Sequence, residues 1–326
     1  MEKRQLGQSD LHVTAIGLGC WVMGGWMWGG ADDADSVAAI RRAVELGVNF
    51  IDTAPVYGQG HSEELVGKAI DGIRDQVVVA TKCGLVWGDR PGREFFVGPD
   101  GVAIRRILEP ASIVRECEDS LRRLKTGVID LYQCHWPDPG TPPSVTMPAL
   151  IRLREQGKIR EIGVSNFSVS DMRACMTHGP LTSDQPQYNM LDRSIEAEIL
   201  PFCRNNRIGV IAYSPLARGL LTGKVTMRRK FADDDHRGNL PWFQPPNRKR
   251  VLEFLGKLKP VADRHGATPG EVAINWVISQ KGVTTAIVGA RDPGQVEENV
   301  KAAEFRLTRS DLAEIRRLLD ELGGPQ

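Results

Sequence analysis

Short runs of apolar residues alternate with longer amphipathic stretches along this chain. The apolar runs predict eight strands, at Ala15–Gly19, Phe50–Asp52, Val77–Lys82, Ile129–His135, Glu161–Ser165, Thr182–Gln185, Gly209–Tyr213 and Thr285–Val288. The amphipathic stretches predict helices at Asp35–Leu46, Ser62–Ile70, Ala111–Leu124, Met147–Gln156, Ser168–Thr177, Glu196–Asn205 and Asp292–Ala303. Strands that alternate with helices in this way favour a parallel sheet built from βα units.

Other predicted elements fall outside this alternation. Lys3–Leu6 and Leu11–Thr14 flank a turn at Gly7–Asp10 and predict an N-terminal β-hairpin, placed where it could close the bottom of a barrel. Two extra helices are predicted at Pro269–Gln280 and Arg309–Leu322. The segments Gly84–Pro110 and Pro215–Arg248 are predicted to be long loops, in which the specificity of a barrel enzyme tends to reside.

Eight βα units can form either a closed barrel or an open, doubly wound sheet. An open sheet that binds a dinucleotide should carry G-x-G-x-x-G after its first strand. Here Gly17 and Gly19 have the right spacing, but position 22 is Val. A phosphate-binding G-x-x-x-x-G-K-[ST] loop is also missing, since Gly219–Lys224 is one residue too short. The pattern therefore favours a single domain over residues 1–326, a (β/α)8 TIM barrel.

Composition and charge exclude several classes of protein. The chain has 326 residues, with 42 basic and 41 acidic side chains and a net charge of +1, so it lacks the electrostatic footprint of a nucleic-acid or anionic-membrane binder. Val13–Ala31 contains no charged residue, but its six glycines favour a strand and a glycine-rich loop over a membrane span. The N-terminus has no apolar run typical of a signal peptide.

Six cysteines are scattered along the chain: Cys20, Cys83, Cys117, Cys134, Cys175 and Cys203. No two have C-x-x-C spacing, and none clusters with histidine as in a zinc site. We therefore expect a protein without a metal centre, in a reducing, cytoplasmic environment.

Polar residues stand where almost every predicted strand ends. The second, third and fourth strands end in Asp52, Lys82 and His135, and further polar residues follow at Ser165–Asn166, Gln185, Tyr213–Ser214 and Arg291. Each has an ordinary structural explanation, and a lone histidine is more often a satisfied core residue than a catalyst. Their shared position at strand ends favours a functional role, because the catalytic residues of a barrel gather at the C-terminal ends of its strands.

Asp52 and Lys82 follow directly on apolar runs, where an unpaired charge is costly, so we expect an ion pair between them. Tyr57 lies five residues beyond Asp52 and can reach the same mouth of the barrel. A nearby ammonium group would lower the pKa of its phenol and favour proton donation, while His135 could hydrogen-bond the same carbonyl oxygen. The set suits the protonation of an oxyanion as it forms.

The chain resembles the aldo-keto reductase family over nearly its whole length. Asn49–Gly58 (NFIDTAPVYG) looks like the first signature of the family, and Ile162–Phe167 (IGVSNF) like its fifth-strand motif. Ile211–Lys224 and Ile287–Asn299 look like its two cofactor segments. Trp136–Pro139 and Trp26–Gly30 are most similar to the bacterial aldo-keto reductases related to general stress proteins.

The resemblance implies a role for each matching residue. Tyr57 would be the proton donor, Lys82 paired with Asp52 would lower its pKa, and His135 would orient the carbonyl. A nicotinamide cofactor would be bound by Gly19, Cys20, Trp21, Asp52, Ser165, Asn166, Gln185, Tyr213, Ser214, Leu216, Arg218, Gly219, Gly289, Arg291, Gln295, Glu298 and Asn299.

The resemblance implies NADP(H) as that cofactor, because Arg291 suits a 2′-phosphate. Two residues depart from relatives: Cys20 stands where many carry threonine, and Gly289 where some branches use lysine. The implied activity is the reduction of aldehydes or ketones to alcohols, with a small carbonyl compound as the substrate.

Two other functions stay open. Channel-associated β subunits resemble this family and act mainly as cofactor-binding or sensing modules. A metal-dependent barrel hydrolase could use Asp52 and His135, although no second histidine stands at a strand end. The sequence leaves the substrate, the physiological direction and the choice between a monomer and a small homo-oligomer undecided.

Overall fold

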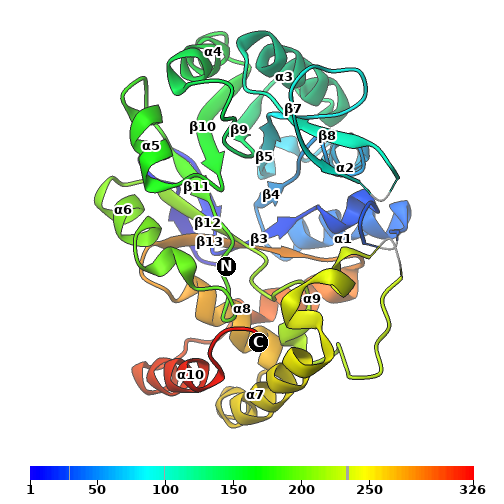
Figure 1. Ribbon diagram of the computed structural model, residues 1–326, viewed down its shortest axis with the longest axis vertical. Coiled ribbons are helices and arrows are strands. Elements are labelled where there is room, and N and C mark those ends of the chain that lie inside the picture. Colours follow the sequence, from blue (N-terminus) through cyan, green and yellow to red (C-terminus); the bar gives the residue numbers. More distant parts are fainter. Residues whose placement is uncertain (29, 99, 233–234) are drawn as a thin grey trace.

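In the computed structural model, eight parallel strands form a closed barrel ringed by helices (Figure 1). The structure describes residues 1–28, 30–98, 100–232 and 235–326, so Gly29 of the Trp26–Gly30 segment lies outside it. Around the barrel the strands follow the order β3, β4, β5, β9, β10, β11, β12, β13. The predicted (β/α)8 barrel is confirmed.

The barrel strands lie close to their predicted positions, and β4 and β12 match them to the residue. Their bounds are β3 Ile16–Gly19, β4 Phe50–Asp52, β5 Val78–Cys83, β9 Ile129–Cys134, β10 Ile159–Ser165, β11 Ser183–Gln185, β12 Gly209–Tyr213 and β13 Val283–Gly289. Seven predicted helices also form, as α1 Asp33–Glu45, α2 His61–Ala69, α3 Pro110–Leu124, α4 Pro143–Glu155, α5 Val169–Met176, α6 Ile199–Asn205 and α9 Pro293–Val300.

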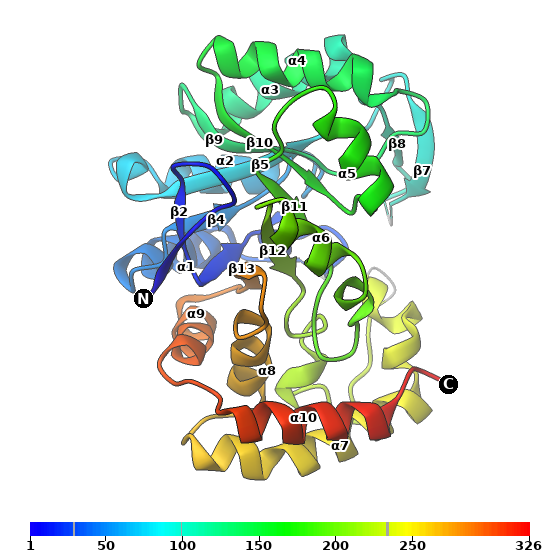
Figure 2. The ribbon, with the colours of Figure 1, turned by 90° about the vertical axis from the view of Figure 1, so that its left-hand side faces the viewer.

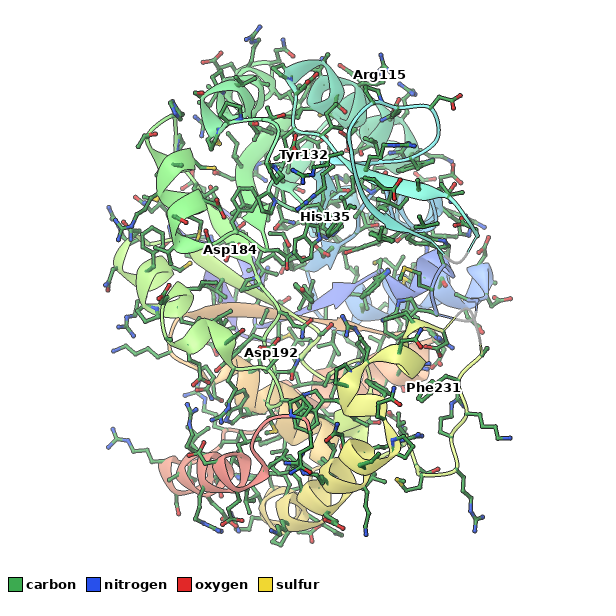
Figure 3. The ribbon with its side chains drawn as sticks, in the orientation of Figure 1. Arg115, Tyr132, His135, Asp184, Asp192 and Phe231 are labelled. Carbon is green, nitrogen blue, oxygen red and sulfur yellow. The ribbon has the colours of Figure 1, made fainter. Side chains whose placement is uncertain are left out.

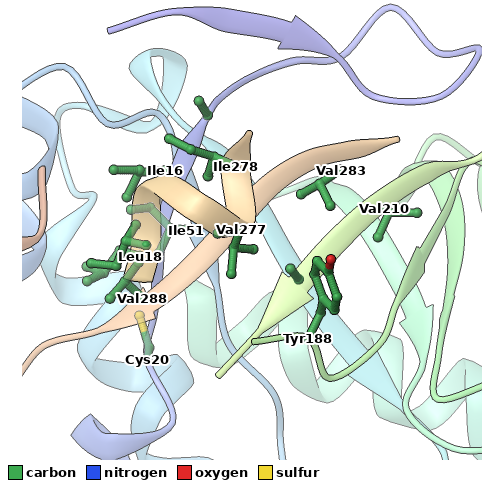
Figure 4. Close-up of a cluster of buried hydrophobic side chains, with 14 of the residues drawn as sticks. Ile16, Leu18, Cys20, Ile51, Tyr188, Val210, Val277, Ile278, Val283 and Val288 are labelled. Atoms are coloured by element: carbon green, nitrogen blue, oxygen red, sulfur yellow. The ribbon is translucent and has the colours of Figure 1, made fainter. Parts of the chain in front are cut away.

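The helices between β12 and β13 correct the prediction. Helix α8 (Pro269–Ile278), expected to be extra, is the crossover helix of the seventh βα unit and packs on β13 (Figure 4). Helix α7 (Pro245–Arg264) was not predicted, because two prolines at its start and a basic cluster made its beginning resemble a loop. It packs against α10 (Arg309–Leu322), and these two are the extra helices (Figure 2).

The segment predicted as the first long loop contains a small sheet. Strands β6 (Leu85–Val86), β7 (Arg93–Val97) and β8 (Ala103–Arg106) pair antiparallel in the order β6-β8-β7. The prediction was wrong because these strands are short and carry charged residues among their apolar ones, which hides the alternation. This sheet stands at the end of the barrel opposite the N-terminus (Figure 2).

The predicted N-terminal hairpin is confirmed, as strands β1 (Lys3–Gln5) and β2 (His12–Thr14). Leu6, Leu11 and Val13 are buried in the inner apolar cluster of the barrel, so the hairpin closes its bottom. The turn fits tightly there: Gly7 has φ of +60°, and a Cβ on it would lie 2.2 Å from the carbonyl oxygen of Thr182. No other residue could therefore occupy this turn without a shift of the backbone.

A second, larger apolar cluster fills the layer between the barrel and its helices, as Figure 4 shows around β3, β13 and α8. All six cysteines are buried and free. Within the described residues, no helix has the length and apolar character needed to span a bilayer.

Candidate active site

One cavity of about 730 Å³ opens at the C-terminal ends of the barrel strands. Every residue that the sequence assigned to catalysis or cofactor binding lines it, except Lys82 and Cys20. Lys82 lies beneath the floor of the cavity. The Cys20 side chain is buried in the outer apolar layer, and only its backbone N–H reaches the carbonyl oxygen of Asp52, at 2.8 Å.

Lys82 and Asp52 form the expected ion pair beneath this cavity. Both side chains are almost wholly buried, and Lys82 Nζ lies 2.7 Å from Asp52 Oδ1. The ammonium group also donates to the carbonyl oxygen of Thr53 at 2.9 Å and to Tyr57 Oη at 3.3 Å. All three of its protons are thus directed at oxygen, which offsets the cost of burying the charge.

Two glutamines hold the other oxygen of Asp52. Gln185 Nε2 donates to Asp52 Oδ2 at 2.7 Å, and Gln133 Nε2 does so at 3.4 Å. Gln133 was not assigned to the site from the sequence. Its position two residues before His135 in the predicted strand Ile129–His135 could have revealed it, because alternate residues face the same side of a strand.

Tyr57 and His135 stand above the pair, with ring centroids 5.8 Å apart and planes at 82°. Figure 3 shows His135 over the centre of the barrel. Burial, with the Lys82 charge, holds the pKa of His135 well below its usual range, so the ring is neutral. Its imidazole can therefore donate a hydrogen bond without carrying a charge.

The expected fall in the pKa of Tyr57 does not occur in this arrangement. Burial, and after it the charge of Asp52, raise the pKa of Tyr57 well above its usual value. The physical reason is that Lys82 is already paired with Asp52, so its ammonium field is largely cancelled at the phenol. Tyr57 is consequently a firmly protonated hydroxyl at neutral pH.

Ser165, Asn166 and Gln185 form a hydrogen-bonded group, here called the amide cluster, beside this centre. The carbonyl oxygen of Gln185 accepts from Ser165 Oγ at 2.7 Å and from the Asn166 N–H at 3.3 Å. Tyr213 Oη donates to Asn166 Oδ1 at 2.9 Å, and Asn166 Nδ2 donates to the His135 carbonyl oxygen at 3.1 Å. The cluster thus ties β10, β11 and β12 to the fourth barrel strand, β9.

Backbone strain collects at the same mouth. Of the eight described non-glycine residues with positive φ, six lie in loops at the C-terminal ends of barrel strands: Met27, Gln59, Asn166, Ser214, Ala217 and Arg218. Such conformations cost on the order of 1 kcal/mol or more each and gather at functional sites. Three of the six, Ser214, Ala217 and Arg218, lie in the turn after β12, which makes this turn the most strained part of the cavity mouth among the described residues.

That turn and its neighbours bring arginines to one side of the cavity: Arg218, Arg229, Arg237 and Arg291. Arg218 makes no hydrogen bond to the described residues, and its Nε is buried. Arg291 uses one nitrogen, Nη2, on the Trp28 carbonyl oxygen at 2.6 Å. Unused guanidinium N–H groups of this kind fit phosphate oxygens. Arg229, Arg237 and the adjacent His236 were not predicted, because they lie in a long loop without a recognisable motif.

Aromatic side chains make up the other side of the cavity. Trp21 stacks between Tyr57, at 6.0 Å, and His236, at 5.3 Å. Trp26 packs on Phe96, and Trp136 packs on Phe95, from the small sheet. Trp21, Trp26, Trp28 and Trp136 line the cavity, whereas Trp87 does not line it and packs in the apolar cluster around Leu85 and Ile104.

A parallel barrel with a buried Lys–Asp pair beneath a tyrosine and a neutral histidine, next to an arginine-lined groove, has the features of a barrel oxidoreductase that takes a phosphate-bearing cofactor. The chain belongs to the aldo/keto reductase family, whose profile matches residues 15–320.

Relatives match over almost the whole chain. It is 41% identical to aldo-keto reductase YhdN of Bacillus subtilis over 98% of this chain and 94% of the relative. It is 39% identical to an NADH-specific methylglyoxal reductase of Escherichia coli, over 99% of both chains. Among solved structures, the glycerol dehydrogenase AKR11B4 of Gluconobacter oxydans is similar, with a TM-score of 0.90 and 39% identity over 99% of this chain and 97% of that one.

Proposed function

We propose that this chain reduces an aldehyde or ketone to an alcohol with NADPH, and that Tyr57 donates the proton. The observation that carries the proposal is the placement of Tyr57 Oη, 3.3 Å from Lys82 Nζ, at the base of the cavity and beside His135. A nicotinamide cofactor would supply hydride to the carbonyl carbon, and the oxygen would then need a proton. Tyr57, protonated at neutral pH, can give it.

The surrounding groups prepare that proton transfer. A neutral His135 can donate a hydrogen bond to the carbonyl oxygen while Tyr57 donates another, which fixes the oxygen between two donors. Once Tyr57 has lost its proton, Lys82 stabilises the phenolate through the existing contact. The high pKa of Tyr57 in the absence of ligand keeps the proton in place until an oxyanion develops nearby.

The donor set along the cavity fits a nicotinamide dinucleotide. The amide cluster offers both donors and acceptors to a carboxamide, and Tyr213 lies beside it with its hydroxyl fixed on Asn166. Arg218, at the strained turn after β12, suits the pyrophosphate. Gly289, Gln295 and Asn299 line the far end of the cavity, where the adenosine would lie.

The preference for NADPH depends mainly on Arg291, which retains Nη1 and Nε for a 2′-phosphate. A feature that favours NADH lies close by: Glu298, in an exposed ion pair with Lys224, could accept from a ribose 2′-hydroxyl. The Escherichia coli relative is described as NADH-specific. The balance between Arg291 and Glu298 should therefore decide the cofactor.

The test is a comparison of NADPH and NADH in the wild-type protein and in Arg291→Ala. Cofactor affinity is measured by calorimetry, and turnover by the loss of near-ultraviolet absorbance with a panel of aldehydes. We expect NADPH to bind more tightly, and Arg291→Ala to weaken NADPH by roughly tenfold or more while leaving NADH within about threefold. Tighter NADH binding by the wild type would overturn the preference for NADPH.

The same assay separates an enzyme from a sensing subunit. A chain that binds either cofactor but turns over no carbonyl compound in a broad panel would contradict the reductase proposal and favour a binding or sensing role.

A further inference from the structure

Asp184 occupies a place where barrel packing calls for an apolar side chain. It is the middle residue of β11 and is paired with Val164 of β10 and Val210 of β12. Both valines belong to the apolar layer between barrel and helices, whereas Ser183 and Gln185 turn into the barrel. The carboxyl of Asp184 therefore enters the outer layer, on the side that α5 and α6 cover (Figure 3).

This carboxyl has no partner in the described part of the chain. The side chain is fully buried, and neither oxygen accepts a hydrogen bond. The N–H groups of Phe167 and Gln185 favour its ionised form, but neither meets hydrogen-bond geometry. Burial dominates and raises the pKa of Asp184 to about 8, so the group is mostly a neutral acid at pH 7.

The neighbouring elements offer no compensating charge. Cys203 of α6 is the titratable side chain that faces Asp184, and burial together with the Asp184 charge raises the pKa of its thiol. The sulfur of Met172, from α5, touches the Cys203 sulfur at 4.0 Å and is not titratable. On the cavity side, burial raises the pKa of Tyr213 of β12, and the Asp184 charge adds to this rise. No lysine or arginine of the described residues forms an ion pair with Asp184.

The two N–H groups near Asp184 belong to the backbone that carries the amide cluster. Phe167 follows Asn166 directly, and Asn166 is held at φ of +62°. The Asn166 N–H and Ser165 Oγ both donate to the carbonyl oxygen of Gln185, the residue that follows Asp184. Asp184 thus lies behind both the turn after β10 and the end of β11.

We propose that Asp184 is a positioning residue: as a neutral acid it supports the amide cluster in the arrangement that receives the carboxamide of a nicotinamide cofactor, and as a carboxylate it displaces that cluster. The inference rests on the proposed function. A carboxylate without a counterion would draw the Phe167 and Gln185 N–H groups towards itself, since charge-assisted hydrogen bonds are shorter and stronger. That movement shifts Asn166 and the Gln185 side chain, and the cofactor then binds less tightly.

The test measures cofactor binding against pH, without turnover. Quenching of tryptophan fluorescence by NADPH and, separately, by NADH gives the dissociation constant between pH 7.0 and 9.5, above the pKa of about 6 of a phosphate monoester. We expect the wild-type constant to rise about tenfold over this span, because ionisation of Asp184 and cofactor binding oppose each other. Asp184→Asn, which mimics the neutral acid, should keep its constant within about twofold.

Two further variants keep the test decisive. Asp184→Val places the same side chain at position 184 as its strand neighbours Val164 and Val210 carry. It should also lose the pH dependence, and it replaces the Asn variant in the test if that variant fails to fold. Glu116→Gln is the matched control: Glu116 is another buried carboxyl with a pKa raised to about 7, but it lies behind β5 and should leave the wild-type slope intact.

The outcomes separate the two proposals. A wild-type constant that does not change with pH, or a wild-type slope retained in Asp184→Asn or Asp184→Val, would overturn the role of Asp184 while leaving the proposed function in place. Failure of the wild type to bind either cofactor at any pH would sink the proposed function, and the role of Asp184 with it.

Discussion

The two halves of the cavity mouth differ in the charge of the side chains they present. The half formed by loops after β3, β4, β5 and β9 is aromatic, with Trp26, Phe95, Phe96 and Trp136 prominent, and apart from Asp52 at the base none of its described lining residues is charged. The half formed by loops after β12 and β13 carries Arg218, Arg229, Arg237 and Arg291, and an exposed Lys224–Glu298 pair.

This difference indicates how one cavity can hold two dissimilar molecules. An anionic dinucleotide is attracted to the arginine half, and a neutral carbonyl compound loses least by leaving water for the aromatic half. The reacting groups, Tyr57 and His135, lie where the two halves meet. Changes in one half should therefore alter one binding constant and leave the other nearly unchanged.

The largest effect should come from the junction itself. Tyr57→Phe should lower turnover about a thousandfold, because no other hydroxyl of the described residues contacts Lys82, while the cofactor dissociation constant stays within about twofold. Steady-state kinetics and calorimetry measure the two quantities. Tyr132→Phe is the control, since it removes a buried hydroxyl that donates to the Ile113 carbonyl oxygen and does not line the cavity. More than a tenth of wild-type turnover in Tyr57→Phe would refute its role.

A large effect confined to the arginine half should follow from Arg218→Ala. Loss of a mostly buried guanidinium that makes no hydrogen bond to any described residue should raise the cofactor dissociation constant about fiftyfold, since charge-assisted hydrogen bonds to phosphate are lost. The Michaelis constant for an aldehyde, measured at saturating cofactor, should change much less. Arg152→Ala, at an exposed position on α4, is the control and should alter neither. Equal changes in both constants would show that the halves are not independent.

A smaller effect concerns the support of the aromatic half. Glu116 is buried, accepts from the Gly84 N–H where the small sheet begins, and has a pKa raised to about 7 from 4.5. Because the folded protein holds the Glu116 proton more tightly than the unfolded chain does, protonation stabilises the fold. This contribution is complete below pH 4.5 and is lost as the pH rises through 7. Between pH 5 and 8 the wild type should therefore lose about 2 kcal/mol more of its unfolding free energy than Glu116→Gln does.

Urea unfolding at the two pH values measures this difference. Glu155→Gln, at an exposed position on α4, is the control and should behave as the wild type. The same pH dependence in the wild type and in Glu116→Gln would contradict the prediction.

The smallest effect should appear as a change in substrate preference. The wild type should favour benzaldehyde over 4-carboxybenzaldehyde, because none of the described residues that line the aromatic half is a cation. Phe96→Lys should shift the ratio of kcat/KM towards the carboxylate by roughly tenfold, which corresponds to about 1.4 kcal/mol. Val114→Lys, an exposed apolar position on α3, is the control. An unchanged ratio would place the substrate outside the aromatic half.

Barrel strands and the central ion pair could be predicted because each depends on local signals. Apolar runs end in Asp52 and Lys82, and the cost of an unpaired buried charge identifies their partnership. The small sheet and α7 escaped prediction because their stability comes from tertiary packing. Leu85 and Ile104, for example, contribute to an apolar cluster with Trp26 and Trp136, which lie far away in the sequence.

The direction of the pKa shift of Tyr57 could not be predicted from the sequence either. That Lys82 would stand near Tyr57 could be expected, but the net effect on the phenol depends on how completely Asp52 and burial oppose the ammonium group. The orphaned carboxyl of Asp184 has no sequence signal either, since a lone aspartate in a short strand can equally face solvent.

The hairpin that closes the barrel has a practical consequence for handling the protein. It places the exposed Met1 at the end of the barrel away from the cavity, whereas the C-terminal residue is hydrogen-bonded to Asn247 of α7 (Figure 2). A surface linker or fusion partner attached ahead of Met1 should orient immobilised molecules with their mouths towards the bulk solution. Attachment at Gln326 would instead disturb its two hydrogen bonds with the Asn247 side chain.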